Sequence, residues 1–198
     1  MLQFSVFGIK VKLSFLFFAV VTIYLILDRS GFGYCGVLAA VSHELGHVIA
    51  YFLVGERPKS VALSIEGMRI TSSDRYLTIG KELFALSAGC FVNFSIFLFL
   101  YYGAKENPEF TQMALVQFSV GLFNLIPVGA LDGGMILRQI LSELFPMRIV
   151  LIFLRFLSWF IILPVFCYAL LILFRERNVT LLITSAFLML SLLQESKT

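Results

Sequence analysis

Long apolar segments dominate the chain, and they constrain its fold more than any other feature. Six of them approach the roughly 20 residues that an α-helix needs to cross a membrane, and short polar loops separate them. Only 14% of the residues are charged, against roughly 25% in soluble domains. The sequence therefore predicts an all-α polytopic membrane protein and excludes a soluble enzyme, a disordered chain and a nucleic-acid binder. The expected spans cover about 13–27, 32–54, 83–102, 113–127, 149–174 and 179–193.

The placement of positive charge predicts the orientation of these spans. Six spans put both termini on one side of the membrane. Of the 15 Lys and Arg residues, ten lie on that side, four on the other, and Arg155 lies within the fifth span. Because cytoplasmic loops are enriched in Lys and Arg, we expect both termini to be cytoplasmic. The first apolar run is followed by no small-x-small cleavage site, so we expect a retained span rather than a signal peptide.

Two stretches alternate between apolar and polar residues as strands do. Residues 4–13 show a broken alternation, and residues 61–70 alternate around a Glu-Gly turn signal. Both lie on the expected cytoplasmic side. They predict a small β element at the membrane edge, and the alternative is two ordinary loops.

The second expected span contains the motif His43-Glu44-Leu45-Gly46-His47. Residues four apart share one face of a helix, so His43 and His47 can present two imidazoles to a single ion. Zinc binds imidazole nitrogen, and a catalytic site leaves one position for water. Glu44 can act as general base on that water and then protonate the leaving amine. Helical rise puts His43 about 16 Å from the cytoplasmic end of its span.

The setting of this motif argues against chance. The chain has two histidines, and both belong to the motif. Ionisable groups inside a membrane span cost several kcal/mol unless they are paired or functional. A metal site is therefore favoured over an accidental or purely structural occurrence.

A third ligand is expected from an acid in an apolar context, and Asp132 is the best placed. It follows Pro127 in a segment with three glycines, a composition that favours an irregular break in a helix. Irregular backbone at membrane depth occurs where protein or a wet cavity surrounds it. The alternative is an ordinary exit turn in which Asp132 caps a short helix that begins near Met135.

Together these motifs resemble the site-2 protease family of intramembrane zinc metalloproteases (peptidase family M50). That family pairs H-E-x-x-H on one span with L-D-G at a later one, here Leu131-Asp132-Gly133. The resemblance implies that His43, His47 and Asp132 hold Zn2+ and that Glu44 activates the water.

Further motifs extend the resemblance. Asn124 and Pro127 fit the family's N-x-x-P pattern, and Ala88-Gly89 followed by Asn93 resembles its A-G-P-x-x-N. The resemblance implies that Asn124 acts in catalysis or substrate handling. Asn93, Asn124 and Pro127 are thus candidates to contact the substrate backbone or a developing oxyanion. For Asn93, a buried amide that bonds neighbouring helices is an equal alternative.

The closest subgroup is the compact bacterial type that processes a sporulation sigma-factor precursor, on the basis of the stretch 81–85 and the six spans. Two positions depart from the family pattern: Cys90 and Ala130 replace its usual prolines. Neither supplies an expected ligand, so local helix geometry rather than activity is affected. All three cysteines, Cys90 included, are expected to be small core residues.

These features predict one intramembrane metalloprotease domain over residues 1–198. Its catalytic core covers about 32–145, and the spans at 13–27, 149–174 and 179–193 are accessory. We expect it to cleave a peptide bond in or near a transmembrane segment of a membrane protein, as in regulated intramembrane proteolysis. An edge strand such as 61–70 would hold the substrate extended.

The expected partners are a membrane-spanning or membrane-associated protein substrate and the lipid bilayer, with no nucleic acid. A second copy of the chain or a regulatory membrane protein stays open. The expected location is the bacterial cell membrane, as a multi-pass protein. Two other function classes would use the same metal site: a divalent metal transporter and a catalytically idle membrane binding protein.

Overall fold

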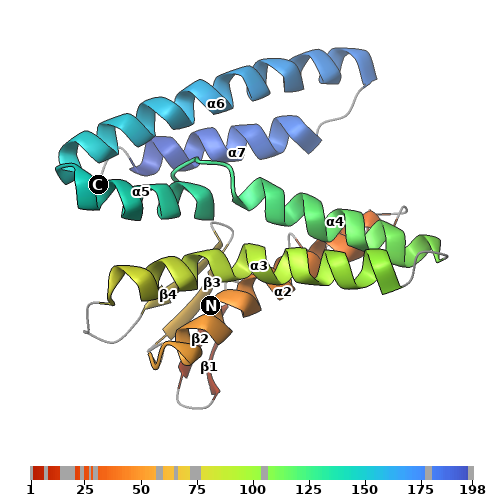
Figure 1. Cartoon of the computed structure of the whole chain (residues 1–198). Helices are drawn as coiled ribbons and strands as arrows, with labels where there is room; N and C mark the ends of the chain where they lie inside the picture. The colour runs from red at the N-terminus through yellow and green to blue at the C-terminus, as the bar shows by residue number, and fades with distance from the viewer. Residues whose placement is uncertain are drawn as a thin grey trace. The chain divides into compact units, whose positions relative to one another are not determined.

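The computed structural model describes residues 2–6, 9–13, 21–22, 25–26, 28, 31–56, 60–64, 67–71, 77–103, 107–176 and 180–195. The chain forms two compact units, Met1–Phe123 and Asn124–Thr198, and each is described by itself (Figure 1). The boundary falls inside the expected catalytic core of 32–145. The single domain over 1–198 stays a prediction.

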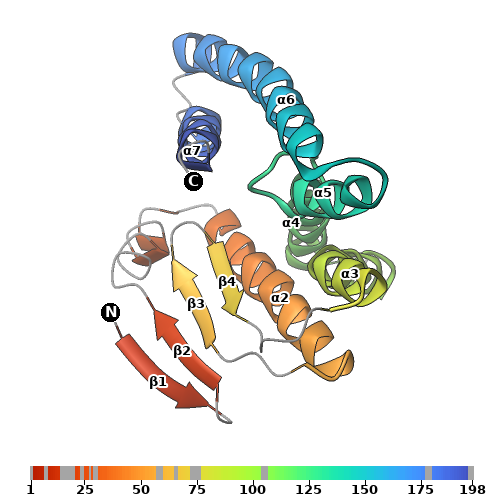
Figure 2. The ribbon, with the colours of Figure 1, turned by 90° about the vertical axis from the view of Figure 1, so that its left-hand side faces the viewer.

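The first unit contains a small sheet built from the two alternating stretches. Its strands run in the order β1-β2-β3-β4, with β2 and β3 parallel and the other pairs antiparallel (Figure 2). The stretch 61–70 is a hairpin rather than one strand, because Ser64 pairs with Gly67. Strand β3 is therefore internal, and β4 lies at an edge. The position of the sheet at the membrane edge stays a prediction. The strands are β1 (Leu2–Val6), β2 (Ile9–Leu13), β3 (Ser60–Ser64) and β4 (Gly67–Thr71).

Helix α2 (Phe32–Leu53) carries the H-E-x-x-H motif. Its 22 residues span about 33 Å, enough to cross the hydrocarbon. Gly31 precedes it with a positive φ of 77°, and the Asp28 carboxylate accepts the Gly33 N–H at 2.7 Å. At the other end, Lys81 Nζ donates to the Val54 carbonyl at 3.0 Å. Each end of α2 thus has one terminal backbone group bonded by a side chain from outside the helix.

Helix α3 (Ile79–Gly103) packs closely against α2. The closeness depends on Gly46, where a Cβ would lie 2.8 Å from the Ala88 carbonyl oxygen. Small residues let helix backbones approach in this way, as is common in membrane proteins.

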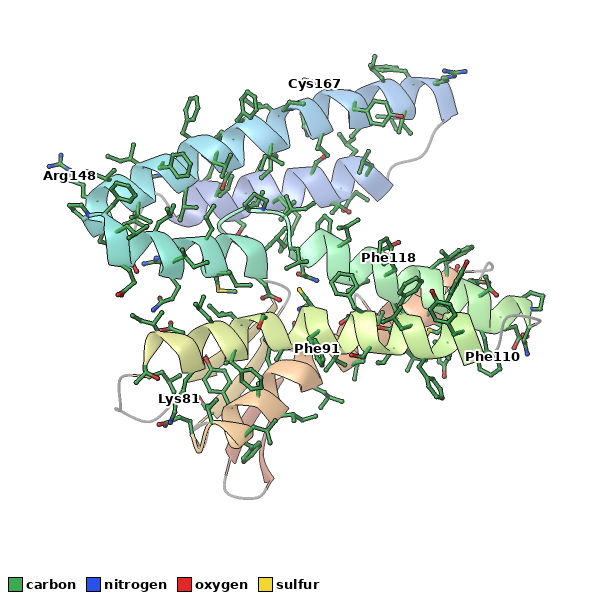
Figure 3. All side chains as sticks on the ribbon, in the orientation of Figure 1. Lys81, Phe91, Phe110, Phe118, Arg148 and Cys167 are labelled. Carbon is green, nitrogen blue, oxygen red and sulfur yellow. The ribbon has the colours of Figure 1, made fainter. Side chains whose placement is uncertain are left out.

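Asn107 precedes helix α4 (Pro108–Asn124), and its Oδ1 accepts the Glu109 N–H at 2.9 Å. The ring of Phe118, labelled in Figure 3, packs on Phe94 and Phe97 of α3, with centroids 5.8 and 5.0 Å apart. Helix α4 ends three residues before Pro127, because a proline disfavours helical backbone at the residue before it.

The second unit consists of α5 (Asp132–Leu144), α6 (Met147–Glu176) and α7 (Thr180–Glu195). Helices α6 and α7 lie side by side (Figures 1 and 2). The segment that leads into α5 is tied to α6, because the Gly129 N–H donates to the buried Ser158 hydroxyl at 3.1 Å.

Three helices of the described part are long and apolar enough to cross a membrane: Phe32–Leu53, Ile79–Gly103 and Met147–Arg175. A shorter apolar helix covers Leu181–Leu193. Most of the expected first span, 13–27, lies outside the described residues. The helical membrane architecture is confirmed, and the count of six spans stays a prediction.

Candidate metal centre

Helix α2 places the two histidines of the motif on its buried face. His43 and His47 are 4% and 8% exposed, and their Nε2 atoms lie 3.2 Å apart. Zn–N bonds of about 2.0–2.1 Å at a tetrahedral angle require a separation of about 3.3 Å. The two nitrogens therefore already have the spacing of two ligands on one zinc ion.

Helix α3 fixes the orientation of both rings. His47 Nδ1 lies 2.8 Å from the Ala85 carbonyl, and His43 Nδ1 lies 3.1 Å from Asn93 Oδ1. The Asn93 amide is itself oriented, because its Nδ2 donates to the Ala39 carbonyl at 3.3 Å. Carbonyl oxygens only accept, so both Nδ1 atoms carry a proton and donate.

This arrangement of protons leaves a lone pair on each Nε2. At 3.2 Å the two Nε2 atoms can share one proton, or they can both bind one cation. The donor set therefore fits a metal ion that accepts imidazole nitrogen, and the Nδ1 bonds are the outer partners that such ligands usually have.

Gly89 of α3 lies directly against the two imidazoles of α2. A Cβ built there would lie 2.5 Å from His47 Nε2 and 2.7 Å from His43 Nε2. Any side chain at this position would enter the space at the two ligating nitrogens. The residues Ala85, Gly89 and Asn93 recur every four positions, so one face of α3 supplies an acceptor, a gap and a second acceptor.

A thiol lies next to the same pair. The Sγ atom of Cys90 is within 4.8 Å of a ring nitrogen of His43, and Cys90 is 3% exposed. The sequence predicted only a small core residue here. The sequence motifs predicted no role for Gly89 or Ala85. Their spacing at intervals of four residues with Asn93 is the signal that places all three on one helix face.

Glu44 follows His43 on α2 and is partly exposed. It thus belongs to the rim of the buried pair rather than to its interior. Its position next to the first imidazole is the one that a general base in this motif requires.

The second unit holds the other predicted site residues in a tight turn. Asn124 ends α4, Pro127 lies in the following turn, and Asp132 is the first residue of α5. The turn folds directly onto the first helical turn: a Cβ at Gly133 would lie 2.1 Å from the Leu125 carbonyl oxygen. Glycine is required at position 133 because the backbone at Leu125 approaches too closely for a side chain.

Asp132 is 6% exposed and lies in the first turn of its helix. The N-cap is Leu131, in extended conformation, so the helix begins three residues earlier than the exit-turn alternative required. A carboxylate at this end interacts favourably with the helix dipole. The start of α5 therefore positions this side chain.

Comparisons with known proteins indicate the type of protein. The family model of peptidase family M50 matches residues 106–164, which include Asn124, Pro127 and Asp132. The solved structure of a site-2 protease from Methanocaldococcus jannaschii is similar with a TM-score of 0.70 at 25% identity, covering 100% of this chain and 95% of that chain. No curated relative matches the chain in sequence.

The helical membrane fold and the oriented imidazole pair define a membrane-embedded metalloprotease. The family model over residues 106–164 and the structural likeness agree on the type: the chain is similar to the site-2-type metalloproteases of peptidase family M50. The relation to the sporulation subgroup stays a prediction.

Proposed function

We propose that this protein is an intramembrane zinc endopeptidase that cleaves a peptide bond in or near a transmembrane segment of a membrane protein. The observation that carries the proposal is the pair of Nε2 atoms, which lie 3.2 Å apart. Two hydrogen bonds that the Nδ1 atoms make to acceptors on α3 hold the rings in this orientation. The pair lies on a helix apolar enough to cross the membrane. The position of Glu44 beside it supports hydrolysis.

The proposed ligands are His43 and His47 from the first unit and Asp132 from the second. The two imidazoles favour zinc over hard cations such as Mg2+, and the nearby Cys90 thiol favours it further. When bound, zinc would polarise the scissile carbonyl and acidify water.

The chain's own groups would move the protons. Glu44 takes a proton from the attacking water on its carboxylate and gives it to the leaving amine nitrogen. Asn124 is proposed to bind the substrate backbone or the developing oxyanion, with Pro127 shaping the turn that holds it. Asn93 is better explained by its alternative, since its Oδ1 and Nδ2 bond His43 and Ala39.

Replacing Glu44 with Gln tests the mechanism. The variant should keep its zinc and lose cleavage of a membrane substrate in liposomes, and His43→Ala should lose both. Normal cleavage by Glu44→Gln would refute the role of Glu44. Metal flux through liposomes that survives this substitution would favour a transporter, and zinc binding with no cleavage by the wild type would favour an idle binding protein.

Strand addition at β4 is the proposed way of holding substrate extended. Backbone N–H groups alternate along an edge strand, one toward the partner strand and the next outward. The substitutions Met68→Pro and Arg69→Pro therefore remove N–H groups on opposite sides of β4. One variant should lose stability, and the other should fold normally but cleave poorly. If both fold and cleave as the wild type does, substrate is not held by strand addition.

The proposed setting is the bacterial cell membrane with both termini cytoplasmic. Partners are the protein substrate and the bilayer, and a second copy or a regulatory membrane protein stays open. Reporter fusions at each terminus test the orientation, and reporters on opposite sides would contradict it.

A further inference from the structure

Hydrogen bonds continue from His43 beyond Asn93 as far as α4, and they are buried at Asn93 and part-buried at Ser42. The Ala39 carbonyl, which accepts from Asn93, also accepts from the Ser42 hydroxyl at 2.9 Å. The Ser42 Oγ atom lies 3.2 Å from Nε2 of Gln117 on α4. We call Gln117, Ser42, the Ala39 carbonyl and Asn93 the α4 relay, and it ends on the Nδ1 atom of His43.

Two side chains of the α4 relay share one acceptor. The Ala39 carbonyl can only accept, and both Asn93 and Ser42 present donors to it. The Ser42 hydroxyl has a second acceptor, Gln117 Oε1 at 3.3 Å, and its oxygen accepts from Gln117 Nε2 at 3.2 Å. Removal of the Gln117 amide therefore takes both a donor and an acceptor from Ser42, and the hydroxyl is then free to change its share of the carbonyl that Asn93 also uses.

The position of Gln117 makes it unusual on its helix. Gln117 is 1% exposed, and its neighbours on the buried face of α4 are Ala114 and Gly121. An apolar side chain would suit this face without needing a partner. A buried amide in an apolar helix is retained where its hydrogen bonds matter, because its burial is costly when it is unpaired.

We propose that Gln117 is a positioning residue for the metal centre. It holds Ser42, and through the Ala39 carbonyl and Asn93 it fixes the rotation of the His43 ring. The hydrogen bond between Gln117 of α4 and Ser42 of α2 is thereby coupled to metal affinity. This inference rests on the proposed function, in which His43 is a metal ligand.

Gln117→Met tests it, because methionine has nearly the same length and no hydrogen-bonding amide. The full-length variant should bind zinc about 10-fold more weakly than the wild type in chelator competition, the lower end of the effect of outer-shell partners. Its Co2+-loaded form should show an altered absorption spectrum. The control is Ser119→Ala on the same helix, whose hydroxyl is exposed and bonds its own helix at Leu115; it should match the wild type.

The route is tested by Ser42→Ala. If Gln117 acts through Ser42, the double variant should lose no more zinc affinity than the more affected single variant. Fully additive losses would overturn the relay. So would a Gln117→Met protein with lower thermal stability but unchanged zinc affinity and Co2+ spectrum. Failure of the proposed function looks different: the wild type would bind no zinc, or His43→Ala would bind it equally well.

Discussion

The α2–α3 pair and the α6–α7 pair are both apolar helix pairs, but they are built in different ways. Between α2 and α3, the backbones approach at Gly46, the imidazoles of α2 lie against Gly89, and these imidazoles bond across the interface to Ala85 and Asn93. On α6 and α7 the buried residues are mostly Val, Leu and Ile. The hydroxyl of Ser185 bonds only its own helix, at Leu181 and Leu182.

The difference separates chemistry from anchoring. An apolar surface is enough to hold a helix in a membrane, and many different side chains can provide such a surface. Orienting two imidazoles requires particular small residues and particular acceptors at a fixed register. Substitutions should therefore have severe, specific effects in the first pair and small effects in the second.

Gly89→Ala should have the largest effect. Its methyl group would lie 2.5 Å from His47 Nε2 and 2.7 Å from His43 Nε2, so we expect zinc affinity to fall by at least about 100-fold. Chelator competition measures this. Gly80→Ala lies on the same helix with nothing within 4 Å of its Cβ and should bind zinc normally. Equal zinc affinity in the two variants would remove the contrast between the helix pairs.

Gly133→Ala should have the next largest effect, in the turn that carries Asp132. The methyl group would lie 2.1 Å from the Leu125 carbonyl oxygen, so the turn must move. A displacement of about 1 Å costs on the order of 100-fold in rate, and we expect cleavage to fall by that amount. The control is Ser142→Ala on α5, whose hydroxyl bonds its own helix at Gln139. If Gly133→Ala cleaves as well as this control, the turn does not position a reactive group.

We expect the smallest effects when two buried serines of the second unit are replaced. Ser158→Ala leaves the Gly129 N–H without its acceptor, which should cost about 1–3 kcal/mol in the free energy of unfolding. Ser185→Ala removes only bonds within α7 and should change it by less than about 0.5 kcal/mol. Thermal unfolding in detergent measures both. A larger loss for Ser185→Ala would mean that α7 depends on polar contacts after all.

The sequence predicted the chemistry of the first unit better than its geometry. The spacing of His43 and His47 on an apolar helix was enough to predict the buried pair. The alternation in 4–13 and 61–70 predicted strands, although not that β3 would be internal. Local patterns define such features because each depends on residues close in the chain.

Contacts between helices were not predictable in the same way. The roles of Gly89 and Gln117 depend on the register of α3 and α4 against α2, which no local pattern encodes. The expected fourth span reached Pro127, but α4 ends at Asn124 because the proline acts on the backbone before it. The sequence predicted equally well that Asn93 binds substrate or that its amide bonds neighbouring helices. Its hydrogen bonds to His43 and Ala39 favour the second role.

X-ray absorption at the zinc edge of the purified Glu44→Gln protein tests the central claim most directly. A metal held by His43 and His47 predicts imidazole scattering from two histidines at about 2.0–2.1 Å. That scattering should disappear in the Glu44→Gln/His43→Ala double variant. Bound zinc without imidazole neighbours, or an unchanged spectrum after loss of His43, would contradict a metal centre on α2.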